Sequence, residues 1–161
     1  MSKILVTGGV GFIGAYLVKK LLEKKHKILI FDNLSTIGGI KHLNRNCKFI
    51  KGNLENPKDV KKIAKWKPEI IFHLAAQSAG ESAYSNPKND YLSNGFGTYN
   101  LCVLAKKINL KHFIYTSSVA VYGSNPKKKI DEETLIKPDS IYGVSKYVGE
   151  MFVNQELKKT K

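Results

Sequence analysis

Arginine is nearly absent from this sequence. Arg45 is the only arginine among 27 basic residues, and lysine supplies the rest. With 13 acidic residues the formal net charge is +14, which indicates an anionic ligand or surface. Arginine is the side chain that best reads base edges and clamps phosphates, and the lysines are dispersed without interleaved aromatic residues. A basic nucleic-acid-binding protein is therefore a minor alternative, and an anionic small molecule explains the charge more simply.

Cysteines and long apolar runs are scarce as well. Cys47 and Cys102 stand in apolar-rich segments without metal-ligand spacing, so we expect reduced core residues and no metal site. No run of about 18 apolar residues occurs, and the sequence predicts neither a membrane span nor a leader segment. The 161 residues suffice for one domain with a hydrophobic core, which we expect to be cytoplasmic.

The motif that stands out is a glycine-rich turn. Gly8, Gly11 and Gly14 follow the apolar run 4–6 and open an amphipathic segment. Glycines allow a tight turn and a close backbone approach, and a helix N-terminus presents free N–H groups to phosphates. The pattern predicts a pyrophosphate-binding turn, although such turns also serve packing alone.

An acidic residue follows at the distance expected for a dinucleotide site. Asp32 ends a second apolar run at 27–31, where a carboxylate can accept hydrogen bonds from the adenosine ribose. Its charge would repel a 2′-phosphate, and no arginine follows to compensate, so NAD is favoured over NADP. The alternative is that Asp32 is only a turn residue before Asn33.

Strand-like and helix-like segments alternate along the whole chain. We expect strands near 3–7, 27–31, 47–51, 69–73 and 112–117, and helices near 12–25, 57–66, 88–108 and 141–159. This alternation predicts an α/β fold of Rossmann type, a doubly wound parallel sheet of about five strands in the order 3-2-1-4-5.

A candidate catalytic group lies near the end of the chain. Tyr142 and Lys146 are four residues apart, which places them on one face of a helix. A nearby ammonium lowers the pKa of a phenol from its usual value near 10, which suits acid–base work. Ser118 follows the fifth predicted strand, where doubly wound sheets bind ligands, although it could equally be a helix cap.

These motifs together resemble the extended short-chain dehydrogenase/reductase superfamily, in its NAD-dependent epimerase/dehydratase branch, and specifically the N-terminal part of proteins like UDP-glucose 4-epimerase. The matching motifs are TGGVGFIG at 7–14, DN at 32–33, GNL at 52–54, HLAAQ at 73–77, NGFGT at 94–98, SS at 117–118, VYG at 121–123, Pro138 and YGVSK at 142–146.

The resemblance implies roles for individual residues. Ser118, Tyr142 and Lys146 would be catalytic: Ser118 would bind the reacting sugar hydroxyl, Tyr142 would take its proton, and Lys146 would bind the nicotinamide ribose. The residues implied to bind or support NAD are Gly8, Gly11, Phe12, Ile13, Gly14, Asp32, Asn33, Asn53, Leu54, Leu74, Ala75, Ala76, Asn94, Tyr142 and Lys146. The family more often has Asp where Asn53 stands.

The reaction implied by the resemblance is epimerisation of a nucleotide-sugar (UDP-, GDP-, CDP- or dTDP-linked) at C4, through a 4-keto sugar and tightly bound NAD. In 4,6-dehydratases an Asp-Glu pair follows the catalytic hydroxyl residue. Val119 and Ala120 occupy those positions here and cannot transfer protons, so dehydration is the weaker alternative.

The resemblance covers only the cofactor-binding part of the family, and the sequence lacks the C-terminal substrate-binding portion. We expect the cofactor part of an epimerase; a stand-alone dinucleotide-binding module or an inactive fragment is the alternative. Relatives pair two helices across a dimer, so the helices near 88–108 and 141–159 predict a homodimer. Extra apolar residues on the second helix fit this, although they could instead pack against the absent portion.

Overall fold

The computed structural model describes residues 1–35, 39–77, 86–108, 110–124 and 129–158. The strands are β1 (Lys3–Thr7), β2 (Lys27–Asp32), β3 (Lys48–Lys51), β4 (Ile70–His73) and β5 (His112–Tyr115). The α-helices are α1 (Phe12–Glu23), α2 (Pro57–Ala64), α4 (Pro87–Asp90), α5 (Gly97–Lys106) and α6 (Ile141–Leu157). Shorter turns are the 3-10 segments η1 (Gly39–His42) and η3 (Val119–Tyr122) and the π-helical η2 (Tyr91–Phe96).

The five strands form one parallel sheet in the order β3-β2-β1-β4-β5, which confirms the predicted topology. Every neighbouring pair is parallel, so each connection must cross over the sheet. The central strand β1 pairs with both β2 and β4: Val6 lies opposite Ile30 on one side and Phe72 on the other. The carboxyl ends of all five strands therefore meet at one edge of the sheet.

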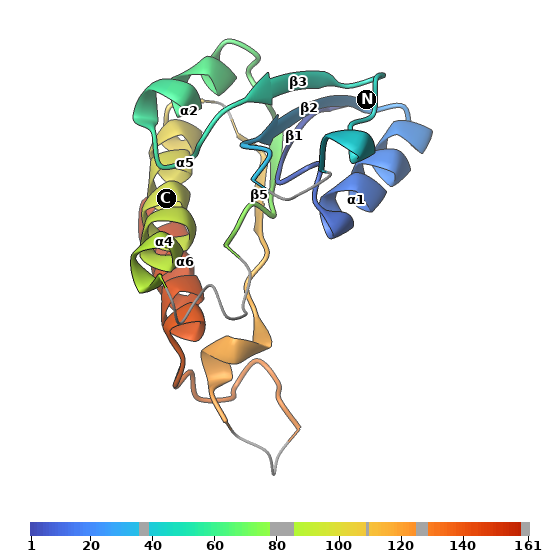
Figure 1. Cartoon of the computed structure of the whole chain (residues 1–161). Coiled ribbons are helices and arrows are strands. Elements are labelled where there is room, and N and C mark those ends of the chain that lie inside the picture. The colour runs from blue at the N-terminus through green and yellow to red at the C-terminus, as the bar shows by residue number, and fades with distance from the viewer. Residues whose placement is uncertain (36–38, 78–85, 109, 125–128, 159–161) are drawn as a thin grey trace.

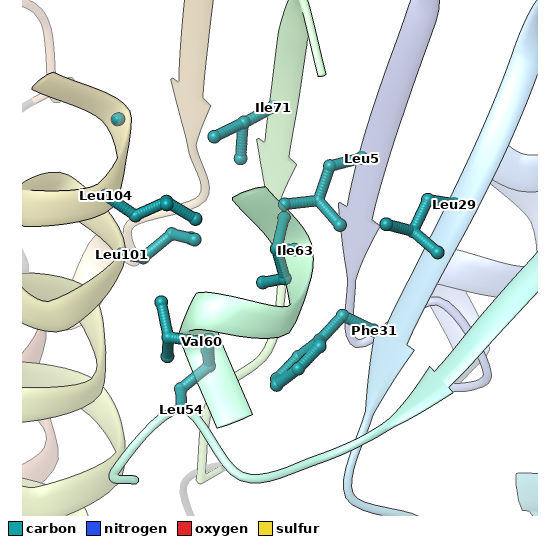
Figure 2. Close-up of a cluster of buried hydrophobic side chains, with 10 residues drawn as sticks. Leu5, Leu29, Phe31, Leu54, Val60, Ile63, Ile71, Leu101 and Leu104 are labelled. Carbon is teal, nitrogen blue, oxygen red and sulfur yellow. The ribbon is translucent and has the colours of Figure 1, made fainter. Parts of the chain in front are cut away.

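Helices cover both faces of the sheet, because the central strands carry apolar side chains on both (Figure 1). On one face, Ile4 and Val6 pack with Val18 of α1. On the other face, Leu5 packs with Ile63 of α2, and Figure 2 shows the side chains of α5 completing this layer. Because successive side chains of β1 point to opposite faces, they contribute to two core layers, and these layers hold the strand ends in place.

Most observed elements differ from the predicted ones by one or two residues at an end, and in two elements the structure shows why the prediction was wrong. The fifth strand was expected to reach residue 117, but β5 ends at Tyr115, because the Ser118 hydroxyl caps η3 and turns the chain away. The predicted helix 88–108 begins at Pro87 and is composite, since the π-helical turn η2 separates α4 from α5. For the predicted helix 141–159, residue 159 lies outside the described residues.

Two expectations from composition can be checked on the described residues. In that part of the chain, no helix is long and apolar enough to cross a membrane. Cys47 and Cys102 are both free thiols. Burial raises the pKa of Cys102 to about 12, so its thiol stays protonated within the core.

Candidate active site

The carboxyl ends of the strands surround a cleft. Its walls come from the segments that follow β1 to β4 and from one residue of η2. The lining residues are Gly8, Gly11, Phe31, Asp32, Asn33, Ser35, Gly52, Asn53, Leu54, Leu74, Ala75, Ala76, Gln77 and Ser93. Ligands of doubly wound sheets bind at this edge, so topology and cleft agree.

The glycine-rich turn leads from β1 directly into α1. Gly8 has φ of +68°, and a Cβ there would come 2.7 Å from the amide nitrogen of Ala75, so both the turn and the close approach require glycine. A Cβ on Gly14 would overlap the carbonyl oxygen of Gly8. The first helical residues, Phe12 and Ile13, have N–H groups without an intrahelical acceptor. The turn therefore has the narrow cradle and the free donors that a pyrophosphate needs.

Asp32 ends β2 and lines the cleft, with only 9% of its surface exposed. Its carboxylate accepts hydrogen bonds from the backbone N–H groups of Leu34 (2.9 Å) and Val10 (3.3 Å). The turn-residue interpretation is thus correct as far as it goes, but each carboxylate oxygen retains accepting capacity for ribose hydroxyls. The bond to Val10 also ties Asp32 to the glycine-rich turn.

The other predicted cofactor residues fall into two groups. Asn33, Asn53, Leu54, Leu74, Ala75 and Ala76 all line the cleft. The side-chain oxygens of Asn33 and Asn53 each accept the N–H group two residues further on, from Ser35 (2.9 Å) and Glu55 (3.1 Å), which shapes the cleft rim. By contrast, Phe12 and Ile13 do not line the cleft, and their side chains are 95% and 63% exposed.

Asn94 is fully buried in η2 and does not line the cleft. Its side chain accepts from the N–H of Gln77 (2.8 Å) and donates to the carbonyl of Gln77 (3.1 Å) and to the hydroxyl of Ser145 (2.9 Å). It therefore holds the segment after β4 against α6. Its hydrogen bonds are structural, and its role in supporting an active site stays a prediction.

The candidate catalytic residues lie on η3 and α6. The Ser118 hydroxyl accepts the N–H of Ala120 at 3.2 Å, so the helix-cap interpretation is correct, and its own proton remains available for donation. Ser140 caps α6 by accepting the N–H of Gly143 at 3.0 Å, which places Tyr142 in the first turn of that helix. Lys146 follows one turn later on the same face.

Lys146 is the most unusual member of this group, because it is a lysine that is only 3% exposed. Its Nζ lies 4.4 Å from the ring centroid of Tyr115 on β5. Burial lowers the pKa of Lys146 to about 8, while Glu150 opposes this shift. A desolvated cation beside the strand ends is a strong hydrogen-bond donor for a polar ligand.

Five cleft residues were absent from the predicted site: Phe31, Ser35, Gly52, Gln77 and Ser93. Gly52 directly follows β3, and Gln77 stands in the segment after β4 beyond Ala76, so the strand ends could have indicated both. Phe31 and Ser35 flank Asp32. Ser93 enters from η2 and donates to Glu55 at 2.6 Å, a long-range contact that no local pattern signals.

Fold, cleft and helix α6 together define a Rossmann-type dinucleotide-binding protein. The family model that describes the NAD dependent epimerase/dehydratase family matches residues 4–159. The chain belongs to this NAD-dependent family, and the predicted cofactor and fold class are confirmed at that level.

Individual relatives and solved structures agree with this family assignment. The chain is 34% identical to UDP-glucose 4-epimerase of Mycolicibacterium smegmatis over 158 residues, which are 94% of this chain and 50% of the relative. It resembles the solved UDP-glucose 4-epimerase of Thermotoga maritima with UDP-glucose (TM-score 0.91, 36% identity, 98% of this chain and 52% of that one). It also resembles the Thermus thermophilus UDP-glucose 4-epimerase complex with NAD (TM-score 0.89, 28% identity, 94% and 50%). The chain thus spans about half the length of these relatives.

Proposed function

We propose that this chain is the cofactor-binding part of a nucleotide-sugar 4-epimerase. The observation that carries this is that one fold holds both groups: the glycine cradle and Asp32 line the cleft, while Ser118 and the Tyr142–Lys146 helix follow β5 outside the cleft lining. A binding module alone has no need of the second group. A cofactor site next to an acid–base pair suits reversible oxidation of a hydroxyl group.

The cradle residues fit NAD because they combine donors, space and one carboxylate. The backbone of Gly8, Gly11 and the start of α1 would hold the pyrophosphate, and Asp32 would hold the adenosine ribose. When bound, NAD supplies a group that accepts a hydride from C4 of the sugar and returns it. Among the described residues that line the cleft there is no arginine, which supports NAD over NADP.

The chain's own residues would manage the proton and the sugar hydroxyl. The Ser118 hydroxyl would donate to the sugar oxygen, and Tyr142 would take the hydroxyl proton and later give it back. The buried Lys146 ammonium would orient the cofactor's ribose and provide positive charge beside Tyr142. Because the proton would return to the same oxygen and the hydride to the opposite face of C4, the net change would be inversion at C4 alone.

Dehydration is the weaker proposal because of the residues after Ser118. Loss of water needs further proton donors and acceptors near the sugar, and Val119 and Ala120 stand there in η3. Their side chains have no titratable group.

A homodimer is part of the proposal. Apolar residues on the described surface gather where η2 meets α6: Tyr91, Val144 and Met151 are 56%, 48% and 43% exposed. A shallow groove lined by Tyr91, Val144 and Val148 joins the two elements. An exposed apolar face shared by two neighbouring helices is typical of a helical subunit interface.

Turnover tests the proposed activity. The chain, supplied with NAD, is incubated with UDP-galactose, and C4 inversion is followed by proton NMR, with Tyr142→Phe as control. UDP-glucose formed by the wild type and lost in the variant supports the proposal. A 4-keto-6-deoxy sugar would establish dehydration instead, and UDP-glucose formed equally by the Tyr142→Phe variant would contradict the role of Tyr142.

A further inference from the structure

A line of buried hydrogen bonds runs through the core from the cofactor cleft to α6. The N–H of Ala75, in the cleft wall, meets the Thr7 hydroxyl at 3.2 Å, and that hydroxyl lies 2.8 Å from Nδ1 of His73. On the other side of the ring, Nε2 lies 2.9 Å from the Thr98 hydroxyl, which donates to the carbonyl oxygen of Asn94 at 2.6 Å. Thr7, His73 and Thr98 are at most 1% exposed.

The positions of the protons in this line follow from the contacts. Two oxygens 2.6 Å apart need a proton between them, and the Asn94 carbonyl has none, so the single hydroxyl proton of Thr98 lies there. The Thr98 oxygen must then accept from His73, which makes Nε2 the protonated nitrogen. Nδ1 is consequently an acceptor, and the Thr7 hydroxyl donates to it while accepting from Ala75.

The line ends on groups that shape the site. Ala75 lies against Gly8 of the glycine-rich turn. At the other end, the side-chain amide of Asn94 donates to the Ser145 hydroxyl. That hydroxyl in turn donates to the carbonyl of Tyr142 at 2.8 Å. One directional set of hydrogen bonds therefore joins the cofactor turn to the helix that carries Tyr142.

We propose that Thr98 is a positioning residue that holds His73 in its Nε2–H tautomer and thereby fixes the cofactor turn relative to α6. Thr98 touches neither the cleft nor the turn, and it acts through His73, Thr7 and Ala75. This role goes beyond the proposed activity and concerns NAD only as a binding probe.

Nitrogen-15 NMR of the histidine rings tests the proposal first in the wild type. The chain has four histidines, and of those in the described residues only His73 is buried, so its signals can be distinguished. We expect the His73 ring to remain neutral, with its proton on Nε2, at every pH from 5 to 8. A Nδ1–H ring, a mixture of tautomers or titration in that range would overturn the assignment, whether or not any variant folds.

Two substitutions of Thr98 then distinguish the effect of its hydroxyl group from the effect of its side-chain shape. Thr98→Val removes the acceptor of Nε2–H, so we expect His73 to move to the Nδ1–H tautomer, the Ala75 amide signal to shift, and NAD to bind about tenfold more weakly. Thr98→Ser retains the hydroxyl and should restore all three properties. An unchanged tautomer and unchanged NAD affinity in a folded Thr98→Val variant would contradict the proposal.

A matched control separates positioning from lost stability. Val60→Ala removes core volume between α2 and the sheet without touching the hydrogen-bonded line, so the tautomer and the Ala75 amide should stay as in the wild type. A changed tautomer in that variant would contradict a specific role for Thr98. The NMR readouts are independent of catalysis, so failure of the epimerase proposal would leave them intact.

Discussion

The ammonium of Lys146 lies 4.4 Å from the ring centroid of Tyr115, and the hydroxyl of the same tyrosine donates to the Lys146 carbonyl at 3.2 Å. One aromatic side chain thus contacts both ends of the lysine. The ring face stabilises a cation that burial would otherwise penalise. Since a buried charge without a full partner costs free energy, the arrangement points to a residue kept for its chemistry.

Replacing Lys146 should stabilise the protein while weakening cofactor binding. The pKa of Lys146 in the folded state, about 8, is below its usual 10.5, so between these values the unfolded chain binds more protons and stability rises with pH. At pH 7 the full penalty is present, and we expect Lys146→Met to raise the unfolding free energy by about 1–2 kcal/mol. Urea unfolding at pH 7 and pH 10 measures the gain in stability of the variant and the rise of wild-type stability with pH. A Met variant less stable than the wild type at pH 7 would contradict this account.

His73 should make the protein sensitive to acid. Burial, and then the nearby Lys146 charge, lower the pKa of His73 to about 3 from 6.5. Below pH 6.5 the unfolded chain takes up a proton that the folded chain refuses, so stability falls by about 1.4 kcal/mol per pH unit. Unfolding curves at pH 7 and 5 should differ less for His73→Asn than for the wild type. His112→Asn, at an exposed histidine, serves as control. An equal loss of stability between pH 7 and pH 5 in all three proteins would show that His73 is not the cause of the acid sensitivity.

The glycine cradle should not tolerate a methyl group at Gly14. A Cβ there overlaps the Gly8 carbonyl, so Gly14→Ala must displace the turn from α1. We expect NAD to bind at least about tenfold more weakly to this variant, as measured by calorimetry. Ala15→Gly is the matched control: it weakens α1 by about 1 kcal/mol without entering the cradle. If both variants lose affinity equally, helix stability and not the cradle explains the result.

Charge on α6 should prevent the proposed dimer. Met151→Lys places an added positive charge in the apolar face, and Ile40→Lys adds the same charge at a residue of similar exposure on η1 (43% and 53%). Sedimentation at about 0.15 M salt, where surface charges are screened, should show a dimer for the wild type and Ile40→Lys and a monomer for Met151→Lys. A wild-type protein that remains monomeric at high concentration would contradict the proposed dimer interface.

Local patterns were sufficient for the topology and for most of the residues that line the cleft. Apolar runs at the strands and the glycine spacing predicted the sheet order and Asp32 at a strand end, because these depend on period and chain order. The π-helical turn η2 was not predictable, since the burial of Asn94 and its bonds to Gln77 and Ser145 are tertiary. The same holds for Tyr115: nothing in its strand signals that its ring faces a lysine 31 residues away.

The most direct test of the central claim is a calorimetric titration of the purified chain with NAD, after a denatured sample has been checked for released NAD. The account predicts a single site per chain with NAD preferred over NADP, and binding about tenfold weaker in Asp32→Ala. Asp139→Ala, which also removes a carboxylate bonded to a backbone N–H, should bind as the wild type does. A folded wild-type chain that neither releases nor binds NAD would contradict the assignment of this cleft as a cofactor site.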